Sequence, residues 1–392
     1  MTSPTDRYSL FRTTGVRVMA RAVFALTLLF LFTKCTNEGS GIVPVRNIEP
    51  LWGGEPELAL EFVDSLTVDS VGITDFTIDK NGALYYLTYK GFSDYTVFRR
   101  SSGGEAPAEF IDFGSQEDIE SMNRVIRRKI GIDADGRLHV FTIQKPELNL
   151  CVEVYGRDGI FETRTQFDFD HFYLNPTGSN ISSSGELIVQ PGKFVLPLTL
   201  LQTPHLAAVY DSEGKLRRKF GFVHEFGLSQ YTLDGNTALF ASDEAGNVYA
   251  AFRHLNRIEK YSPGGQLLFR ADRPLNYAVT EHVKKQTGSR MDLLSSVRSN
   301  ERLTDVSAVI GIDSEGRLWV PTFTRQDSTG STMGFIYCGP ENGELQVFTP
   351  EGQLLGAVSL PVKFFTMKVF GDRVFFQNSD FKAITEFRIV GR

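Results

Sequence analysis

The sequence is poor in the residue groupings that mark metal-dependent and nucleophilic enzymes. Its three cysteines and six histidines are dispersed, and no C-x-x-C pair or Cys/His cluster is present, so nothing supports a zinc site. G-x-S-x-G, H-E-x-x-H and Walker-type glycine loops are absent as well. The net charge of −6 and the lack of a basic run argue against nucleic-acid binding, which needs concentrated Lys and Arg. We therefore expect no catalytic set, no bound metal, no cofactor and no nucleic-acid partner.

The first apolar run is too short to span a membrane. AVFALTLLFLF, residues 22–32, follows Arg17 and Arg21, and this arrangement is typical of the apolar part of a secretory signal peptide. We expect a signal peptide over residues 1–34. A start at Met19 would give it a more usual length.

Cys35 lies directly after this segment and resembles the lipidated cysteine of bacterial lipoproteins. Lys34 departs from that motif, which has a small residue at this position. We expect lipid attachment at Cys35, a tether over 35–56, and a location in the cell envelope, lipid-anchored to a bacterial membrane on its periplasmic or outer surface. One acyl chain anchors a protein only marginally, whereas two or more anchor it stably.

One short phrase recurs along the chain. GIDADGRLHV at 131–140 and GIDSEGRLWV at 311–320 both place an acidic turn with a glycine between two apolar strands. In such a turn Asp or Ser caps the backbone and Gly takes a positive φ. Six copies are found, at 79–87, 133–141, 182–190, 243–252, 313–321 and, in a degenerate form, 369–377.

A second hairpin follows these copies. It is clear at 152–164, 207–220, 257–270 and 345–358, and 95–104 is the version in the first blade. Two hairpins make a four-stranded antiparallel blade, and six blades in a ring make an all-β, six-bladed β-propeller. The spacing of roughly 50–70 residues exceeds the ~40–50 of common blades and indicates insertions. A β-sandwich would not repeat paired hairpins, and tandem domains would need a linker, so we expect a single domain over 57–392.

The two ends of the repeat region predict how the ring closes. The last copy ends with a third strand at 383–392, while ELALEFVDSLTV, residues 57–68, alternates like a strand without a blade. We expect this segment to form the outer strand of blade six, which would otherwise leave an unpaired edge. Cys151 and Cys338 then fall in blades two and five, too far apart for a disulfide, so we expect two free, mostly buried thiols.

Part of the repeat resembles a known family. In GNVYAAFRHLNRIEKYSPGGQLL, residues 246–268, the order of Asn256, Arg257, Ile258 and Tyr261 is similar to that of an NHL-type repeat. With the export signal, the whole arrangement resembles the six-bladed β-propeller lipoproteins common in Bacteroidetes-like bacteria. The resemblance implies a fold and carries no chemistry.

Loop lengths predict which face of the ring is functional. The turns within hairpins are short and share one face, while the long insertions, at 105–125, 190–206, 271–304 and 325–343, fall on the other. Long loops on one face of a rigid scaffold are where binding is usually built. Seven side chains near the ends of second strands are candidate ligand contacts there: Tyr89, Gln144, Gln190, Arg253, His254, Arg325 and Asn378. Arg253 and Arg325 suit a carboxylate or a sugar acid, although ordinary solvation in loops is the simpler interpretation.

Two insertions have features of their own. Residues 191–204 form an apolar stretch with candidate partner contacts at Phe194, Leu196, Leu198 and Leu200. Such a patch suggests a partner or membrane contact, unless the loop is buried over the ring or extends a hairpin. Residues 276–303 have the spacing of one or two short helices, which we expect to cap the ring; a mobile lid is the alternative.

Isolated polar residues give weaker signals. Asp168, Asp170 and His171 in FDFDHF could ligate a cation, but a polar strand end explains them more simply. His139 occupies the position of Trp319 and Tyr249 in other copies, so we expect it to pack beside its strand.

Two functional hypotheses follow. The first is an envelope-anchored, monomeric, non-catalytic binding scaffold for a peptide, glycan or protein partner on the long-loop face. The alternative is a metal-dependent, channel-centred hydrolase or lyase of the gluconolactonase type. A cation coordinated in the central channel by residues such as Asp305 or Asn175 would favour the alternative.

Overall fold

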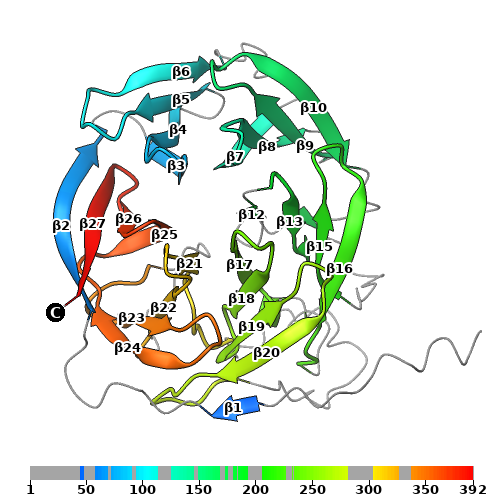
Figure 1. The fold of residues 1–392 in the computed structure, drawn as a ribbon, viewed down its shortest axis with the longest axis vertical. Coiled ribbons are helices and arrows are strands. Elements are labelled where there is room, and N and C mark those ends of the chain that lie inside the picture. The colour runs from blue at the N-terminus through cyan, green and yellow to red at the C-terminus, as the bar shows by residue number, and fades with distance from the viewer. Residues whose placement is uncertain are drawn as a thin grey trace, which may run out of the picture. The chain divides into compact units, whose positions relative to one another are not determined.

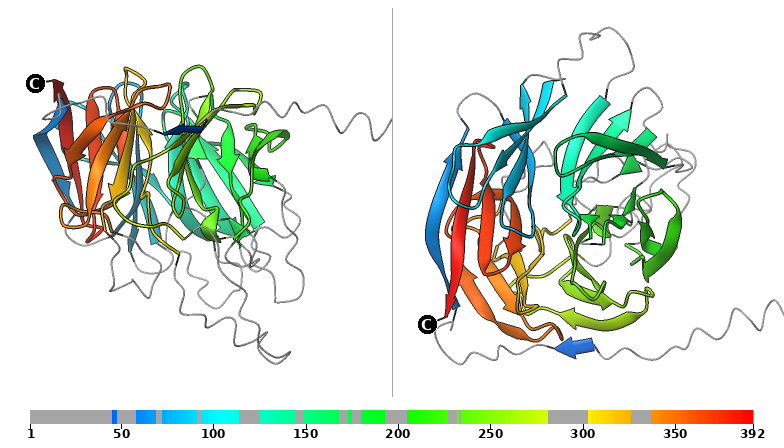
Figure 2. Two further views of the ribbon diagram at one scale, coloured as in Figure 1. Left: turned by 90° about the horizontal axis from the view of Figure 1, so that it is seen from below. Right: turned by 45° about the horizontal axis from the view of Figure 1, so that its top comes forward.

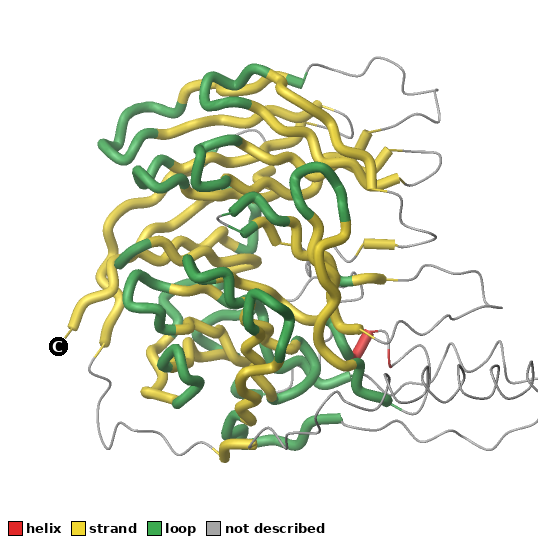
Figure 3. The backbone as a smooth tube through the Cα atoms, turned by 45° about the vertical axis from the view of Figure 1, so that its right-hand side comes forward, coloured by secondary structure: helices red, strands yellow, loops and turns green. Residues whose placement is uncertain are grey.

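The fold consists almost entirely of strands. A computed structural model describes residues 45–47, 58–68, 72–90, 94–113, 125–144, 149–167, 173–174, 180–182, 184–192, 205–226, 232, 234–280, 303–325 and 337–391. Helical residues within these ranges are confined to a short stretch at Thr232, Asp234 and Gly235 (Figure 3). Accordingly, the described ranges contain no helix with the length and apolarity needed to cross a membrane.

Six four-stranded antiparallel blades form a ring, as the sequence predicts (Figure 1). From the axis outward, blade 1 is β3 (Gly72–Ile78), β4 (Leu84–Lys90), β5 (Asp94–Arg100), β6 (Ala108–Asp112), and blade 2 is β7 (Val125–Ile132), β8 (Leu138–Gln144), β9 (Asn149–Tyr155), β10 (Phe161–Phe167). Blade 3 is β12 (Asn180–Ile181), β13 (Leu187–Val189), β15 (His205–Tyr210), β16 (Leu216–Phe222), and blade 4 is β17 (Ala238–Ser242), β18 (Val248–Phe252), β19 (Arg257–Tyr261), β20 (Leu267–Asp272). Blade 5 is β21 (Gly311–Ile312), β22 (Leu318–Phe323), β23 (Gly343–Phe348), β24 (Leu354–Ser359), and blade 6 is β25 (Phe364–Phe370), β26 (Arg373–Asn378), β27 (Ala383–Gly391), β2 (Leu58–Thr67). A separate two-stranded sheet pairs β11 (Tyr173–Leu174) with β14 (Pro191–Gly192).

The core is divided into six parts. Among the described residues, one hydrophobic cluster lies between each pair of adjacent blades. Trp319, for example, is fully buried between blades 5 and 6. Cys151 and Cys338 are both free and buried, which confirms the prediction of unpaired thiols. The ring is therefore held together by side chains that alternate toward the two faces of each blade.

The ring closes as the sequence predicts. β2 pairs with β27 in an antiparallel register that runs from Leu58 opposite Gly391 to Thr67 opposite Ala383. Leu58 contributes to the cluster between blades 5 and 6, and Leu66 to the cluster between blades 6 and 1. Backbone pairing and two apolar side chains thus complete the last blade with a strand that precedes the first one in the sequence (Figure 2).

The segment expected as a tether contains a short strand. β1 (Val45–Asn47) pairs in parallel with β20, with Val45 opposite Arg270 and Asn47 opposite Asp272. β20 is the outermost strand of blade 4, so its outer N–H and C=O groups are available for pairing. Blade 4 consequently has a fifth strand.

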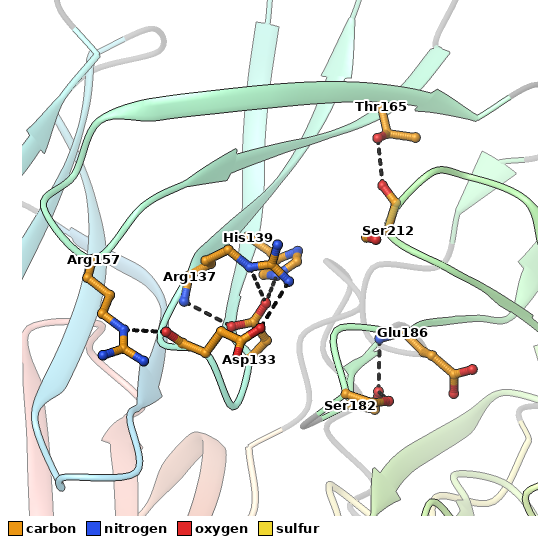
Figure 4. A network of polar contacts seen from close by, with 10 residues as sticks. Asp133, Arg137, His139, Arg157, Thr165, Ser182, Glu186 and Ser212 are labelled. Atoms are coloured by element: carbon orange, nitrogen blue, oxygen red, sulfur yellow. Dashed lines mark hydrogen bonds and ion pairs between the residues drawn. The ribbon is translucent and has the colours of Figure 1, made fainter.

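The recurring turn has one construction in three blades. In each of these blades a ring nitrogen or a hydroxyl of the following strand lies close to Oδ2 of the turn aspartate. The distance is 3.0 Å for His139, 2.8 Å for Trp319 and 3.2 Å for Tyr249. The turn aspartates are Asp133, Asp313 and Asp243 respectively, and each also accepts backbone N–H groups through Oδ1. His139 therefore packs beside its strand, as predicted (Figure 4). The recurring sequence keeps the same structure in these blades because its aspartate forms hydrogen bonds that connect the turn to the following strand.

Glycine is required inside these turns. Gly136 has φ 75° and Gly316 has φ 76°, and the N–H of each donates to the carbonyl of the turn aspartate, at 2.9 and 3.0 Å. A residue with a Cβ is strained at this φ. The prediction of positive φ at the turn glycines is confirmed.

Candidate functional site

The two faces of the ring differ in the length of their connections. Because strands in a blade are antiparallel, the first–second and third–fourth turns lie on one face, and the second–third and blade-to-blade connections lie on the other. On the first face the turns are as short as Asp133–Gly136 and Asp313–Gly316. The other face, which we call the long-loop face, carries the longer connections of the four predicted insertions, and the structure describes their ends. The first insertion was predicted too long, because residues 105–107 finish the β5–β6 turn on the opposite face and residues 108–112 form strand β6.

Arg253, His254 and Asp305 meet on the long-loop face between blades 4 and 5. Arg253 and His254 follow directly after β18, and the segment that enters blade 5 docks beside them, because Val306 N–H donates to the Arg253 carbonyl at 2.6 Å. Asp305 Oδ1 then lies 3.3 Å from Nε of Arg253 and 3.4 Å from Nδ1 of His254. We call these three residues the 253–305 cluster.

The protonation of the cluster follows from burial and from its own charges. Burial, reinforced by the charge of Arg253, lowers the pKa of His254 to about 3, so the imidazole is neutral at neutral pH. Nδ1 lies 3.0 Å from the carbonyl oxygen of Thr304, and because a carbonyl only accepts, Nδ1 carries the proton. Nε2 is then an acceptor, and no partner for it is found in the described part of the chain. Partial burial raises the pKa of Asp305, and Arg253 opposes this shift.

The cluster lies at the base of the 271–304 insertion. Contacts beside the cluster join the two ends of the insertion: the hydroxyls of Thr280 and Thr304 are 2.9 Å apart, and Tyr277 Oη lies 3.2 Å from the carbonyl oxygen of Asp305. Tyr277 Oη also lies 2.9 Å from the carbonyl oxygen of Phe323 in β22. Burial raises the pKa of Tyr277 to about 12, so this hydroxyl stays protonated as a donor. The insertion therefore leaves and re-enters the ring next to Arg253 and His254.

Arg273 anchors the same insertion from inside. Its side chain is fully buried, with Nη1 at 2.8 Å from Thr322 Oγ1 and Nη2 at 2.6 Å from Ser307 Oγ. Its Nε is buried without a hydrogen-bond partner among the described residues, and burial lowers its pKa to about 10. Both neutral hydroxyls belong to blade 5 or its entry segment, so Arg273 joins blades 4 and 5.

The cluster offers mixed polar chemistry. About a fifth of the Arg253 side chain and a third of the Asp305 side chain are exposed, at 21% and 34%. A ligand would meet a guanidinium donor, a carboxylate acceptor and the imidazole acceptor side by side. This combination suits hydroxyl and amide groups, which both donate and accept hydrogen bonds.

An aromatic group occupies the same face between blades 5 and 6. The rings of Phe365 and Phe381 are 4.9 Å apart, and Tyr337 lies 6.4 and 6.3 Å from them. Nζ of Lys363 lies 5.8 Å from the Tyr337 ring centroid. Phe381 has φ 61°, a left-handed conformation that is rare for an aromatic residue and is tolerated chiefly where surrounding structure imposes it. The long-loop face thus combines a polar cluster with partly buried aromatic rings.

The other predicted contacts do not converge. Tyr89 is 43% exposed at the end of β4, and its ring covers the Cα of Gly72. Gln190 is buried and bonds across to blade 4, donating to the carbonyl of Asn236 and accepting from Ala238 N–H. Arg325 is exposed after β22, and Asn378 accepts a hydrogen bond from Thr385 at 3.1 Å. Among the six of these residues whose side chains the structure describes, only Arg253 and His254 come together.

Several predicted residues lie outside the described ranges. These are Cys35, the partner-contact residues Phe194, Leu196, Leu198 and Leu200, the FDFDHF residues Asp168, Asp170 and His171, Asn175, and the side chain of Gln144. Their roles stay predictions. Within the described ranges, no group of three or more His, Cys, Asp and Glu side chains is arranged to hold a metal ion.

One repeated polar contact was missed by sequence analysis. Glu259 is 1% exposed, and accepts from Tyr261 Oη and from Arg270 Nε, the latter at 2.7 Å. Blade 2 repeats this with Glu153, which accepts from Tyr155 and Arg164. An E-x-Y pattern with an Arg in the facing strand would have shown it. Tyr261 is therefore part of the scaffold.

Comparisons with known proteins identify the fold and no family. No protein-family model matches the chain, and no curated protein sequence matches it. A solved member of the DUF4221 family from Bacteroides vulgatus is 10% identical with a TM-score of 0.55, over 86% of this chain and 100% of that one. Virginiamycin B lyase from Staphylococcus aureus is 10% identical (TM-score 0.45, 85% and 100% covered), and a putative gluconolactonase 11% identical (0.46, 85% and 99%). At such identities the likeness shows the fold alone.

Proposed function

We propose that this β-propeller is an envelope-anchored, non-catalytic binding scaffold that recognises a peptide, glycan or protein partner on its long-loop face. The 253–305 cluster carries the proposal. It presents a donor, a carboxylate and a neutral imidazole at the point where the longest insertion meets the ring. Peptides and glycans are rich in the amide and hydroxyl groups that such a set can bind.

Anchoring is the second part of this proposal. The apolar run at 22–32 followed by Cys35 supports export and lipid attachment. A Cys35→Ser variant expressed in a bacterial host is expected to leave the membrane fraction for the soluble one. An unchanged distribution would contradict lipid anchoring and leave the binding proposal intact.

Binding is tested by comparing the two faces. A peptide and glycan array is probed with the wild type, then with Arg253→Ala and with Glu315→Ala. Glu315 lies in a short turn on the opposite face and is exposed, with 67% side-chain exposure, so it is the matched control. We expect a bound probe to be lost with Arg253→Ala and kept with Glu315→Ala. A probe that survives Arg253→Ala and is lost with Glu315→Ala would place the binding surface on the wrong face.

The alternative is a metal-dependent hydrolase or lyase of the gluconolactonase type. One observation favours it: His254 is held neutral with its Nε2 as an acceptor, which is the form that ligates a metal ion. Metal analysis of the purified protein, followed by melting with and without a chelator, separates the two. A stoichiometric divalent ion whose removal lowers the melting temperature would favour the enzyme, and indifference to the chelator would favour the scaffold.

A further inference from the structure

Three aromatic residues at blades 5 and 6 are separate from the hydrophobic core. Tyr337, Phe365 and Phe381, which we call the aromatic triad, have ring centroids 4.9, 6.3 and 6.4 Å apart. Each of the three is partly exposed. Within the described ranges, none of them is among the residues that form or contact the six hydrophobic clusters. The triad is therefore distinct from the packing that joins one blade to the next.

Three separate segments bring the triad together on the long-loop face. Tyr337 lies at the end of the last insertion, where Cys338 and Phe364 pair through backbone hydrogen bonds of 2.9 and 3.3 Å. Phe365 is the extra residue at which the register of β25 with β26 shifts, and a bulge of this kind redirects a side chain. Phe381 lies in the turn between β26 and β27. Two of the three rings are thus placed by irregular backbone.

Phe381 has a conformation that does not suit phenylalanine. Its φ of 61° is the only positive value at a residue other than glycine in the part of the chain that the structure describes. In this conformation the Phe381 N–H donates to the carbonyl of Asn378 at 3.0 Å, and the Phe381 carbonyl accepts from Ile73 N–H at 2.7 Å. Glycine or asparagine would form the same backbone contacts with less strain. The backbone therefore does not account for an aromatic residue at this position, and the reason lies in the ring.

An ion pair borders the triad. Nζ of Lys363 lies 5.8 Å from the centroid of the Tyr337 ring and 3.4 Å from Oε1 of Glu341. The side chains of Lys363 and Glu341 are 51% and 47% exposed. Because their charges cancel, this border offers hydrogen-bond donors and acceptors without favouring an ion of either sign. A wholly apolar ligand would remove water from both charges without replacing its hydrogen bonds, which is unfavourable.

Hydrogen bonds connect the triad to the 253–305 cluster past the end of β22. Tyr277, beside the cluster, donates its hydroxyl to the carbonyl of Phe323, the last residue of β22. The N–H of the next residue, Thr324, donates to the carbonyl of Asn342 at 2.9 Å. Nδ2 of Asn342 then donates to the carbonyl of Tyr337 at 3.1 Å. The polar cluster and the aromatic triad thus flank the same strand end on the long-loop face.

We propose that the aromatic triad is a stacking site for a neutral pyranose residue, and that the ligand of the long-loop face is an oligosaccharide. A pyranose has an apolar C–H face, which packs on an aromatic ring, and hydroxyl edges, which donate to Glu341 and accept from Lys363. Further sugar residues extend along the face toward the 253–305 cluster, whose mixed donors and acceptors suit hydroxyl groups. This inference rests on the proposed function and selects glycans from the ligand classes named there.

Titration calorimetry with oligosaccharides tests the triad. Tetrasaccharides of the cello-, chitin, malto- and xylo- series are titrated into the wild type, Phe381→Asn, Tyr337→Ala and Phe161→Asn. Phe161 is the matched control, because it is an aromatic residue with 53% exposure at the start of β10, on the opposite face. We expect at least one series to bind the wild type and the control, with the Kd raised about tenfold in both triad variants. Binding of none of the series, or equal Kd values in the triad variants and the control, would overturn the proposal.

Melting temperatures separate a binding role of Phe381 from a structural one. Asparagine tolerates the φ of 61°, so Phe381→Asn is relieved of a strain that Phe161→Asn does not relieve. Phe381→Asn should therefore melt at a temperature no lower than that of Phe161→Asn. A lower melting temperature, or failure of Phe381→Asn to fold, would show that the ring serves the fold and would refute the stacking site.

Arg253→Ala and a peptide array distinguish this inference from the proposed function. Loss of oligosaccharide binding in Arg253→Ala with unchanged binding in the triad variants would refute the stacking site and support the 253–305 cluster. Loss in the triad variants alone would support the stacking site and count against the cluster. A peptide that binds the wild type while no oligosaccharide does would overturn this inference and leave the proposed scaffold intact.

Discussion

Substitution of Leu66 by alanine tests whether β2 holds the ring closed. Leu66 is 8% exposed and belongs to the cluster that joins Ile384 of blade 6 to Ile73 and Tyr86 of blade 1. Replacing a buried leucine by alanine costs about 3 kcal/mol, from lost burial and from the cavity that remains. We expect the free energy of unfolding to fall by this amount.

Urea unfolding followed by tryptophan fluorescence measures the loss. A protein of this size unfolds with a slope of about 3 kcal/mol per molar urea or more, so the midpoint should fall by up to about 1 M at an unchanged slope. Val63→Ala is the matched control, because Val63 lies in the same strand, is 40% exposed and is skipped by the register with β27. Exposed substitutions of this kind usually change stability by no more than about 0.5 kcal/mol.

Equal midpoints for the two variants would refute the reasoning, since Leu66 would then contribute no more than an exposed side chain.

Deletion of residues 58–67 extends the test from one side chain to the whole strand. It should expose the outer edge of β27 and produce larger species by size-exclusion chromatography, because an unpaired edge recruits another chain. A deletion variant that stays monomeric with an unchanged melting temperature would show that closure does not depend on β2.

Three further predictions concern the recurring turn, and urea unfolding measures each. Gly316→Ala forces a positive φ on alanine and should lower the free energy of unfolding by on the order of 1 kcal/mol or more. Its control is Gly103→Ala, which should change stability little because Gly103 has open space around it and no positive φ. Equal losses of stability in the two variants would contradict the role of the positive φ. Trp319→Phe removes the indole N–H that donates to the carboxylate of Asp313 and should lower the free energy of unfolding by about 2 kcal/mol. A loss below about 0.5 kcal/mol would contradict this prediction. Burial alone would raise the pKa of Asp133, but hydrogen bonds from His139 and Arg137 lower it from 3.8 to about 2. A carboxyl group whose pKa is lower in the folded than in the unfolded chain stabilises the fold above its unfolded-chain pKa, and this stabilisation is lost as the pH falls. The difference in free energy of unfolding between the wild type and Asp133→Asn should therefore shrink by about 2 kcal/mol from pH 5 to pH 2. A difference that stays constant over this range would contradict the prediction.

Much of the scaffold is readable from the sequence because it is built from local rules. The turn of Asp313 and Gly316 requires a capping side chain and a positive φ within four residues, so its pattern is clear in five of the six copies, with Ser182 in place of the aspartate in one of them. The sequence also predicts that residues 58–67 close the ring. Their period-2 alternation indicates a strand, and because they belong to no hairpin of their own, the open edge of the last blade is the place left for it.

The remaining features depend on contacts between distant segments. β1 pairs through its backbone, and three residues of backbone pairing leave no side-chain pattern in the sequence. Asp305 reaches Arg253 across 52 positions, at a point decided by where the insertion returns to the ring. Glu259, in the third strand of its blade, is charged yet 1% exposed, which reverses the ordinary expectation for a glutamate. Gln190 likewise bonds between blades, which its position at a strand end does not indicate.

The pairing of β2 with β27 also has a consequence for how the protein is made. Leu58 and Gly391 are separated by roughly 330 residues, and bringing the ends of such a segment together costs on the order of 5 kcal/mol of chain entropy beyond that of the shortest loop. Chains are synthesised from the amino terminus, so β2 is among the first strands to emerge and must wait for the last. Until then it is an unpaired strand, and the assembly of the ring depends on keeping this segment away from other chains during synthesis.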